Sequence, residues 1–223
     1  MKNCDNKKIR ILITAGPTRE KIDDVRFITN RSSGKMGYAL AEAALKSRMD
    51  VTLISGPVCL NPVNGVKTIK VESASEMAAA VFQNAPECEI IISAAAVADY
   101  MPETVTEGKI KKREGGLVLK LKRTTDILET LGASKRKDLF LVGFAAETEK
   151  LLENAEGKLK KKNLDLIIAN NVADSSIGFN SDSNEVTLIF STGQTVDIPF
   201  GSKKSIAETI IDKILNIVQK KHQ

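Results

Sequence analysis

The feature that most constrains this chain is its opening, where an apolar run leads through a turn and a polar loop into an alanine-rich helical pattern. The run is Ile9–Thr14, and the turn contains Gly16. A buried strand followed by a loop and a helix usually opens a nucleotide-binding α/β fold. Ser32, Ser33 and Gly34 would then lie at the helix N-terminus, where unpaired amides and the helix dipole attract phosphate. The alternative is that Ser32 or Ser33 only caps a surface helix.

Apolar runs of strand length alternate with helical patterns along most of the chain. The alternation predicts βαβ crossovers and an α/β fold with a Rossmann-like, mainly parallel sheet and helices on both faces. Leu117–Lys122 alternates apolar and charged residues, which predicts a half-exposed strand in a small projecting β arm or flap at about 103–123. Glu185–Phe190 and Thr195–Ile198 predict a closing hairpin. The other expected strands are 9–14, 51–55, 66–71, 89–94, 139–143 and 165–170, and the expected helices are 33–48, 74–84, 126–135, 148–162 and 203–220.

Length and composition predict one domain over residues 1–223 of a soluble, cytoplasmic protein. No apolar run approaches the roughly 18 residues that cross a bilayer. The net charge of +5 is mild, and two Tyr, seven Phe and no Trp do not provide the aromatic–basic pattern of a nucleic-acid binder. Cys4, Cys59 and Cys88 have neither disulfide nor metal-ligand spacing, so we expect no metal site built from side chains.

The single histidine is His222, the penultimate residue, so imidazole chemistry is not expected. Catalysis would depend on positioning and on lysine, arginine and amide groups, which suits reactions of phosphate.

Ser93 and three alanines, Ala94-Ala95-Ala96, end the fourth expected strand, and Asp99 follows them. Side chains this small leave backbone exposed to a ligand, and a nearby carboxylate can accept a hydrogen bond from a base or a ribose hydroxyl. The alternative is close packing against a helix, with Asp99 in an ordinary turn.

Two basic runs follow. Lys109 and Lys111 lie between glycines in the expected flap, and Lys158 and Lys162 are spaced to share one helix face. Either run can hold an anion, and either can be a solvated surface.

A dinucleotide fingerprint is missing. It requires G-x-G-x-x-G after the first strand and an acid after the second, whereas this chain has Gly16 and then Ser55-Gly56-Pro57. A nicotinamide-dependent reductase is therefore disfavoured.

The order of these segments resembles the phosphopantothenate–cysteine ligase family, the phosphopantothenoylcysteine synthetases of coenzyme A biosynthesis. The resemblance covers nearly the whole chain, in what looks like the free-standing bacterial form. A separate phosphopantothenoylcysteine decarboxylase is then an expected partner. The motifs that carry it are 16–20, 30–37, 94–99, 109–112, 143–148, 162–165 and 169–172.

The resemblance implies a two-step ligation in a homodimer, with no nucleic acid or membrane involved. Phosphopantothenate would attack the α-phosphate of CTP and release pyrophosphate, and the amine of L-cysteine would then displace CMP from the acyl cytidylate. Mg²⁺ would bind with the triphosphate. A nucleotide-sensing module without chemistry is the second alternative.

The resemblance also implies residue roles. Asn30 and Lys109 match the catalytic positions, Asn30 as the amide that handles the acyl intermediate. Asn30→Asp is expected to leave nucleotide binding nearly intact and block the second step, and Lys109–Arg113 is expected to be loose until ligands bind. The substrate positions are Arg26, Asn30, Ala95 and Ala96, and the nucleotide positions are Ser32, Ser33, Gly34, Ser93, Ala94, Ala95, Asp99, Lys109, Thr125, Asp126, Ile127, Leu128, Phe144, Lys158 and Lys162.

Overall fold

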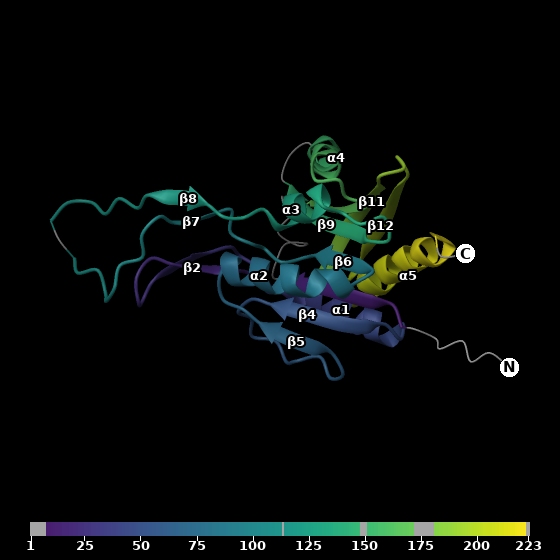
Figure 1. Ribbon diagram of the computed structural model, residues 1–223, viewed down its shortest axis with the longest axis horizontal. Helices are drawn as coiled ribbons and strands as arrows, with labels where there is room; N and C mark the ends of the chain where they lie inside the picture. The colour runs from purple at the N-terminus through teal and green to yellow at the C-terminus, as the bar shows by residue number, and fades with distance from the viewer. Residues whose placement is uncertain (1–7, 113, 148–150, 172–180, 222–223) are drawn as a thin grey trace.

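A computed structural model describes residues 8–112, 114–147, 151–171 and 181–221. Its centre is an eight-stranded sheet with the strand order β12-β11-β10-β9-β6-β1-β4-β5 (Figure 1). The strands from β10 to β5 are parallel, and β11 and β12 form an antiparallel hairpin at one edge. The strands are β1 (Arg10–Ala15), β4 (Asp50–Ser55), β5 (Lys67–Lys70), β6 (Ile90–Ser93), β9 (Phe140–Glu147), β10 (Leu166–Asn171), β11 (Ser183–Phe190) and β12 (Thr195–Ser202).

Helices cover both faces of this sheet. Because successive side chains of a strand point to opposite faces, Ile11 and Ile13 pack with α1 and α5, whereas Leu12 packs with α2, α3 and α4. The predicted α/β class, the parallel sheet and the closing hairpin are confirmed. The helices are α1 (Lys35–Lys46), α2 (Ala74–Asn84), α3 (Ile127–Ala133), α4 (Leu151–Lys161) and α5 (Lys203–Lys221), with a 3-10 turn, η1, at Ala85–Glu87.

The junction between β1 and α1 is built on close contact. A Cβ on Gly37 would lie 2.5 Å from the Cβ of Ala15, and one on Gly56 would lie 1.8 Å from the carbonyl oxygen of Pro17. Gly34, not a serine, is the N-cap of α1, and it has a φ of 76° in the left-handed region. Because the N-cap position is taken by Gly34, which has no side chain, the alternative that Ser32 or Ser33 is the N-cap residue of this helix is wrong.

Two short antiparallel pairs stand outside the main sheet. The first is β2 (Arg19–Lys21) with β3 (Phe27–Thr29), which the sequence did not predict. The second is β7 (Tyr100–Pro102) with β8 (Leu121–Arg123), at the base of a long arm that projects from the sheet (Figure 1).

The arm is where the strand prediction is wrong. Residues 117–120 form no strand, and Leu117, Val118, Leu119 and Leu121 are all exposed. Alternation buries one face only when another layer packs against it, and no such layer covers the arm among the described residues.

The thiols have different surroundings. Cys59 is exposed, and Cys88 is buried, which raises the pKa of its thiol to about 11 and keeps it protonated at neutral pH. Cys4, Arg113, Thr148, Val172 and His222 lie outside the described residues. In the described part of the chain, we find no helix with the length and apolar character that a membrane crossing requires.

Candidate active site

A cavity of about 870 Å³ opens along the carboxyl ends of the parallel strands. Its lining comes from the start of α1, the segment after β6, the start of α3, the middle of β9 and the last turn of α4. This is the edge at which α/β sheets usually bind ligands.

Backbone hydrogen bonds hold the alanine segment that forms one wall, which we call the alanine floor (residues 94–98). Thr14 Oγ1 accepts the Ala95 N–H at 3.1 Å, and Thr18 Oγ1 accepts the Ala98 N–H at 3.0 Å. The Ala96 N–H donates to the Gly16 carbonyl at 2.9 Å. Ala94, Ala95 and Ala96 are of intermediate burial, and their small side chains leave this wall of the cavity only partly covered.

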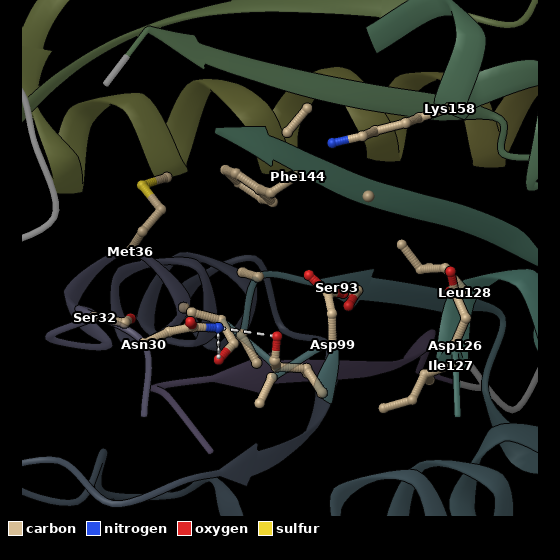
Figure 2. Close-up of a pocket in the computed structure, with 18 of the residues that line it drawn as sticks. Asn30, Ser32, Met36, Ser93, Asp99, Asp126, Ile127, Leu128, Phe144 and Lys158 are labelled. Atoms are coloured by element: carbon tan, nitrogen blue, oxygen red, sulfur yellow. Dashed lines mark hydrogen bonds between the residues drawn. The ribbon is translucent and has the colours of Figure 1, made fainter. Parts of the chain in front are cut away.

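The side chain of Asn30 is hydrogen-bonded to the alanine floor. Its Nδ2 donates to the carbonyl oxygens of Ala96 at 3.3 Å and Val97 at 3.0 Å (Figure 2). An amide group has two N–H donors, and both are engaged here. Asn30 therefore shapes the floor in this state, a role that the sequence did not indicate.

Lysines form the opposite wall. Lys158 extends from α4 on the side of the cavity where Phe144 lies, across from Asn30 and Asp99 (Figure 2). The Nζ of Lys162 lies 2.7 Å from Asp126 Oδ2, and Asp126 Oδ1 accepts the Glu129 N–H at 3.0 Å as the N-cap of α3. Partial burial opposes charge on Asp126, but the hydrogen bonds from Lys162 and the Glu129 amide outweigh it and lower the pKa of this carboxyl.

A second group of charges lies where α1 meets α5. Lys35 Nζ lies 2.7 Å from Asp182 Oδ1, and Lys203, which lines the cavity, is only 7% exposed. Burial lowers the pKa of Lys203, and the charge of Lys35 lowers it further. We did not predict Lys203, because a lysine at the start of an amphipathic helix is usually solvated.

Cationic side chains outnumber anionic ones in the lining. The residues involved are Arg31, Lys35, Arg123, Lys158, Lys161, Lys162 and Lys203, against Asp99, Asp126 and Glu129. Such a surplus favours an anionic ligand.

Most of the predicted site residues meet at this cavity. Two do not line it: the Arg26 guanidinium contacts Asp23 and the Ile110 carbonyl, and Lys109 lies in the arm. Those that line it are Asn30, Ser32, Ser33, Gly34, Ser93, Ala94, Ala95, Ala96, Asp99, Thr125, Asp126, Ile127, Leu128, Phe144, Lys158 and Lys162.

A metal ion here would need oxygen ligands from the substrate. Within the described ranges, no group of three or more His, Cys, Asp or Glu residues is placed to hold an ion. Mg²⁺ is commonly held by one or two carboxylates and substrate phosphates, and the lining contains three carboxylates, Asp99, Asp126 and Glu129. The residues present therefore fit an ion that binds with a nucleotide.

Comparisons with known proteins agree on one family. Residues 6–218 match the family described as "DNA/pantothenate metabolism flavoprotein C-terminal domain". The chain is 50% identical over 205 residues to the coenzyme A biosynthesis bifunctional protein CoaBC of Bacillus subtilis, covering 92% of this chain and 50% of that protein. The chain thus spans about half the length of that relative.

Solved structures give the same result. The fold is similar to the crystal structure of the C-terminal domain of a CoaBC protein, with a TM-score of 0.82 and 45% identity over 95% of this chain and 96% of that one. It is also similar to Cab2 mutant H337A in complex with phosphopantothenate-cysteine, with a TM-score of 0.77, covering 95% of this chain and 87% of that one. At 19% identity the second likeness shows the fold alone.

Proposed function

We propose that this chain, which belongs to the DNA/pantothenate metabolism flavoprotein C-terminal domain family, joins phosphopantothenate to L-cysteine at the expense of CTP. The observation that carries the proposal is a cavity with the alanine floor on one wall and lysines on the other. A nucleoside triphosphate requires both kinds of surface, one for its base and ribose and one for its charge. The name of the Bacillus subtilis relative, a coenzyme A biosynthesis protein, supports the choice of substrates.

The nucleotide would lie across the cavity. Asp99 would accept hydrogen bonds from the cytidine, and Lys158 and Lys162 would screen the triphosphate. Mg²⁺, held together with the triphosphate, would lower the charge that an incoming carboxylate meets, alongside Lys158 and Lys162.

In the first step a carboxylate oxygen of phosphopantothenate attacks the α-phosphorus of CTP. The bond from that phosphorus to the β-phosphate bridging oxygen breaks, and pyrophosphate leaves with the bond electrons. In the second step the amine of cysteine attacks the acyl carbon, the bond from this carbon to the phosphate oxygen breaks, and CMP leaves. Water or a phosphate oxygen takes the amine proton, since no described side chain of the cavity is a histidine.

Asn30 would act at the acyl group. Both of its N–H donors are bound to backbone carbonyls, so one of these bonds must yield to the substrate. The 3.3 Å bond to Ala96 is the longer, and it is the one that we expect to be replaced by a bond to the acyl oxygen.

A second copy of the chain would cover the arm. Val105, Leu117, Val118, Leu119 and Leu121 expose apolar surface there, up to 86% for Val118. Several exposed apolar side chains on one projecting segment favour a protein interface, which supports a homodimer.

Lys109 would then reach a triphosphate from the arm. The product would pass to a phosphopantothenoylcysteine decarboxylase.

Pyrophosphate release tests the proposal directly. CTP with phosphopantothenate is expected to release pyrophosphate before cysteine is added, and cysteine should then release CMP. ATP in place of CTP tests the choice of nucleotide. A nucleotide-sensing module would bind CTP without release, and a reductase would instead bind NAD(P)H.

Lys158→Met should greatly reduce the release. Lys46→Met is the matched control. The Nζ of Lys46 lies 2.7 Å from Glu208 Oε1, and Lys46 does not line the cavity. Equal losses in both variants would show that lysine removal acts through stability instead.

A further inference from the structure

A buried carboxylate lies in the loop between β2 and β3, outside the cavity. Asp23 is 1% exposed, and its side chain is completely covered. Its Oδ1 accepts the N–H groups of Val25 at 2.9 Å and Arg26 at 2.7 Å, and its Oδ2 accepts the Arg26 guanidinium, with Nε at 2.9 Å. The Arg26 guanidinium holds the pKa of this carboxyl well below its usual range.

The ion pair also holds a distant segment. Ile110 is bound at both of its backbone groups: its N–H donates to Asp23 Oδ2 at 3.0 Å, and its carbonyl accepts Arg26 Nη2 at 3.0 Å. Ile110 lies in the arm, 87 residues after Asp23 in the sequence.

The neighbouring amides of the arm bind the same loop. The Thr106 N–H donates to the Ile22 carbonyl at 3.1 Å, and the Gly108 N–H donates to Asp24 Oδ2 at 2.8 Å. Alternate amides at 106, 108 and 110 therefore attach to the loop at 22–24, one through a backbone carbonyl and two through carboxylates. Lys109 lies between two of these attachment points.

A local turn does not account for this arrangement. The hydrogen bonds from the Val25 and Arg26 amides to Asp23 would suffice to order the loop. Burying an ionised carboxylate costs free energy unless hydrogen bonds and a paired cation offset the loss of hydration. Here the third amide that Asp23 accepts, and one donor of Arg26, go to the arm. The pair is thus built to connect two segments.

We infer that Asp23 is a positioning residue, which through Arg26 and the backbone of Ile110 fixes the position of Lys109 within the arm. This deepens the proposed function and rests on it for the role of Lys109. It also limits the expected looseness of the flap: residues 106–110 are attached, and movement on ligand binding would occur further along, near Gly115 and Gly116. Both of these glycines have open space around them.

Proteolysis without any ligand tests the attachment independently of catalysis. In Asp23→Asn, tryptic cleavage after Lys109 and Lys111 should be about ten- to a hundredfold faster than in the wild type, because charge-assisted hydrogen bonds that oppose local opening are lost. Asp24→Asn is the matched control, since the exposed Asp24 accepts one arm amide, and its effect should be within about threefold. Cleavage of Asp23→Asn at the wild-type rate would overturn the inference.

Ile110→Pro protects the test against a variant that does not fold. It removes the N–H that Asp23 accepts and leaves the loop and the ion pair unchanged. Cleavage after Lys111 should again accelerate. If Asp23→Asn unfolds globally and Ile110→Pro cleaves like the wild type, Asp23 only stabilises its own loop and the inference is wrong.

Turnover shows whether the attachment acts through Lys109. Asp23→Asn should lower kcat for pyrophosphate release more than it raises KM for CTP. In a Lys109→Gln background it should cost no more than about a further twofold, because the two changes would affect one interaction. If the reduction in kcat of the double variant equals the product of the reductions in the two single variants, the link to Lys109 is wrong. No pyrophosphate from the wild type would refute the proposed function alone, and the proteolysis result would still stand.

Discussion

The substitution Asn30→Asp distinguishes two roles of Asn30, as a donor to the acyl intermediate and as a hydrogen-bonding partner of the alanine floor. The family resemblance implied that Asn30 donates a hydrogen bond to the acyl intermediate, so nucleotide binding was expected to remain nearly intact in Asn30→Asp. In the structure both N–H donors of Asn30 hold the alanine floor at Ala96 and Val97. Asn30→Asp removes both donors and places carboxylate oxygens against two carbonyl oxygens.

The magnitude follows from the bonds that are lost. A neutral hydrogen bond contributes about 0.5–1.5 kcal/mol, so the loss of two should cost about 1–3 kcal/mol of unfolding free energy. Because Asn30 is exposed, we expect a value in the lower half of that range. Asn30→Ala loses the same bonds without the repulsion, and the difference between the two variants measures the repulsion itself.

Two measurements check the reasoning. Guanidinium unfolding should rank the wild type above Asn30→Ala and Asn30→Asp lowest. Calorimetry should show CTP binding about fivefold weaker in Asn30→Asp, because binding must then also order the alanine floor, at a free-energy cost of about 1 kcal/mol. Wild-type stability together with wild-type CTP affinity would refute a structural role and leave the original role at the acyl group.

Three further outcomes are expected. Asp99→Ala should weaken CTP binding by about 1–3 kcal/mol in calorimetry, the cost of an unpaired ligand donor, and an unchanged affinity would make this carboxylate structural. Folding lowers the pKa of Asp126, so the ionised carboxyl stabilises the fold fully above its unfolded pKa of about 3.9, and this stabilisation is lost as the pH falls from there through the lower pKa of the folded state. Urea midpoints measured from pH 6 to pH 2 should therefore fall less steeply in Asp126→Asn than in the wild type. Parallel curves would contradict the assignment. A maleimide should label Cys59 rapidly in the native protein and Cys88 only after unfolding, whereas equal rates would contradict the burial of Cys88.

The fold was accessible from sequence because strand and helix periods are local signals. Ile11 and Ile13 pack on one face of the sheet and Leu12 on the other, as a fully buried parallel strand requires. The residues of the cavity were accessible for a related reason, since the carboxyl ends of parallel strands share one edge.

The rest depends on contacts between distant segments. Leu117–Lys120 has the alternation of a strand, but no layer of the described chain covers it. Asp23 reads as an ordinary loop residue, and nothing in its neighbourhood indicates Ile110, 87 residues away. Lys203 is buried only because α5 meets α1 at the cavity, which depends on the whole sheet.

The glycine contacts at the start of α1 bear on how freely this sequence can diverge. Neither Gly37 nor Gly56 leaves room for a single added carbon, whereas Gly116 and Gly157 have nothing within 4 Å of that position. Under random mutagenesis the first two should accept almost no replacement, and the last two should accept many. An engineer who wants new specificity should therefore diversify the arm and the lysine wall, and retain the junction between the first strand and the first helix unchanged.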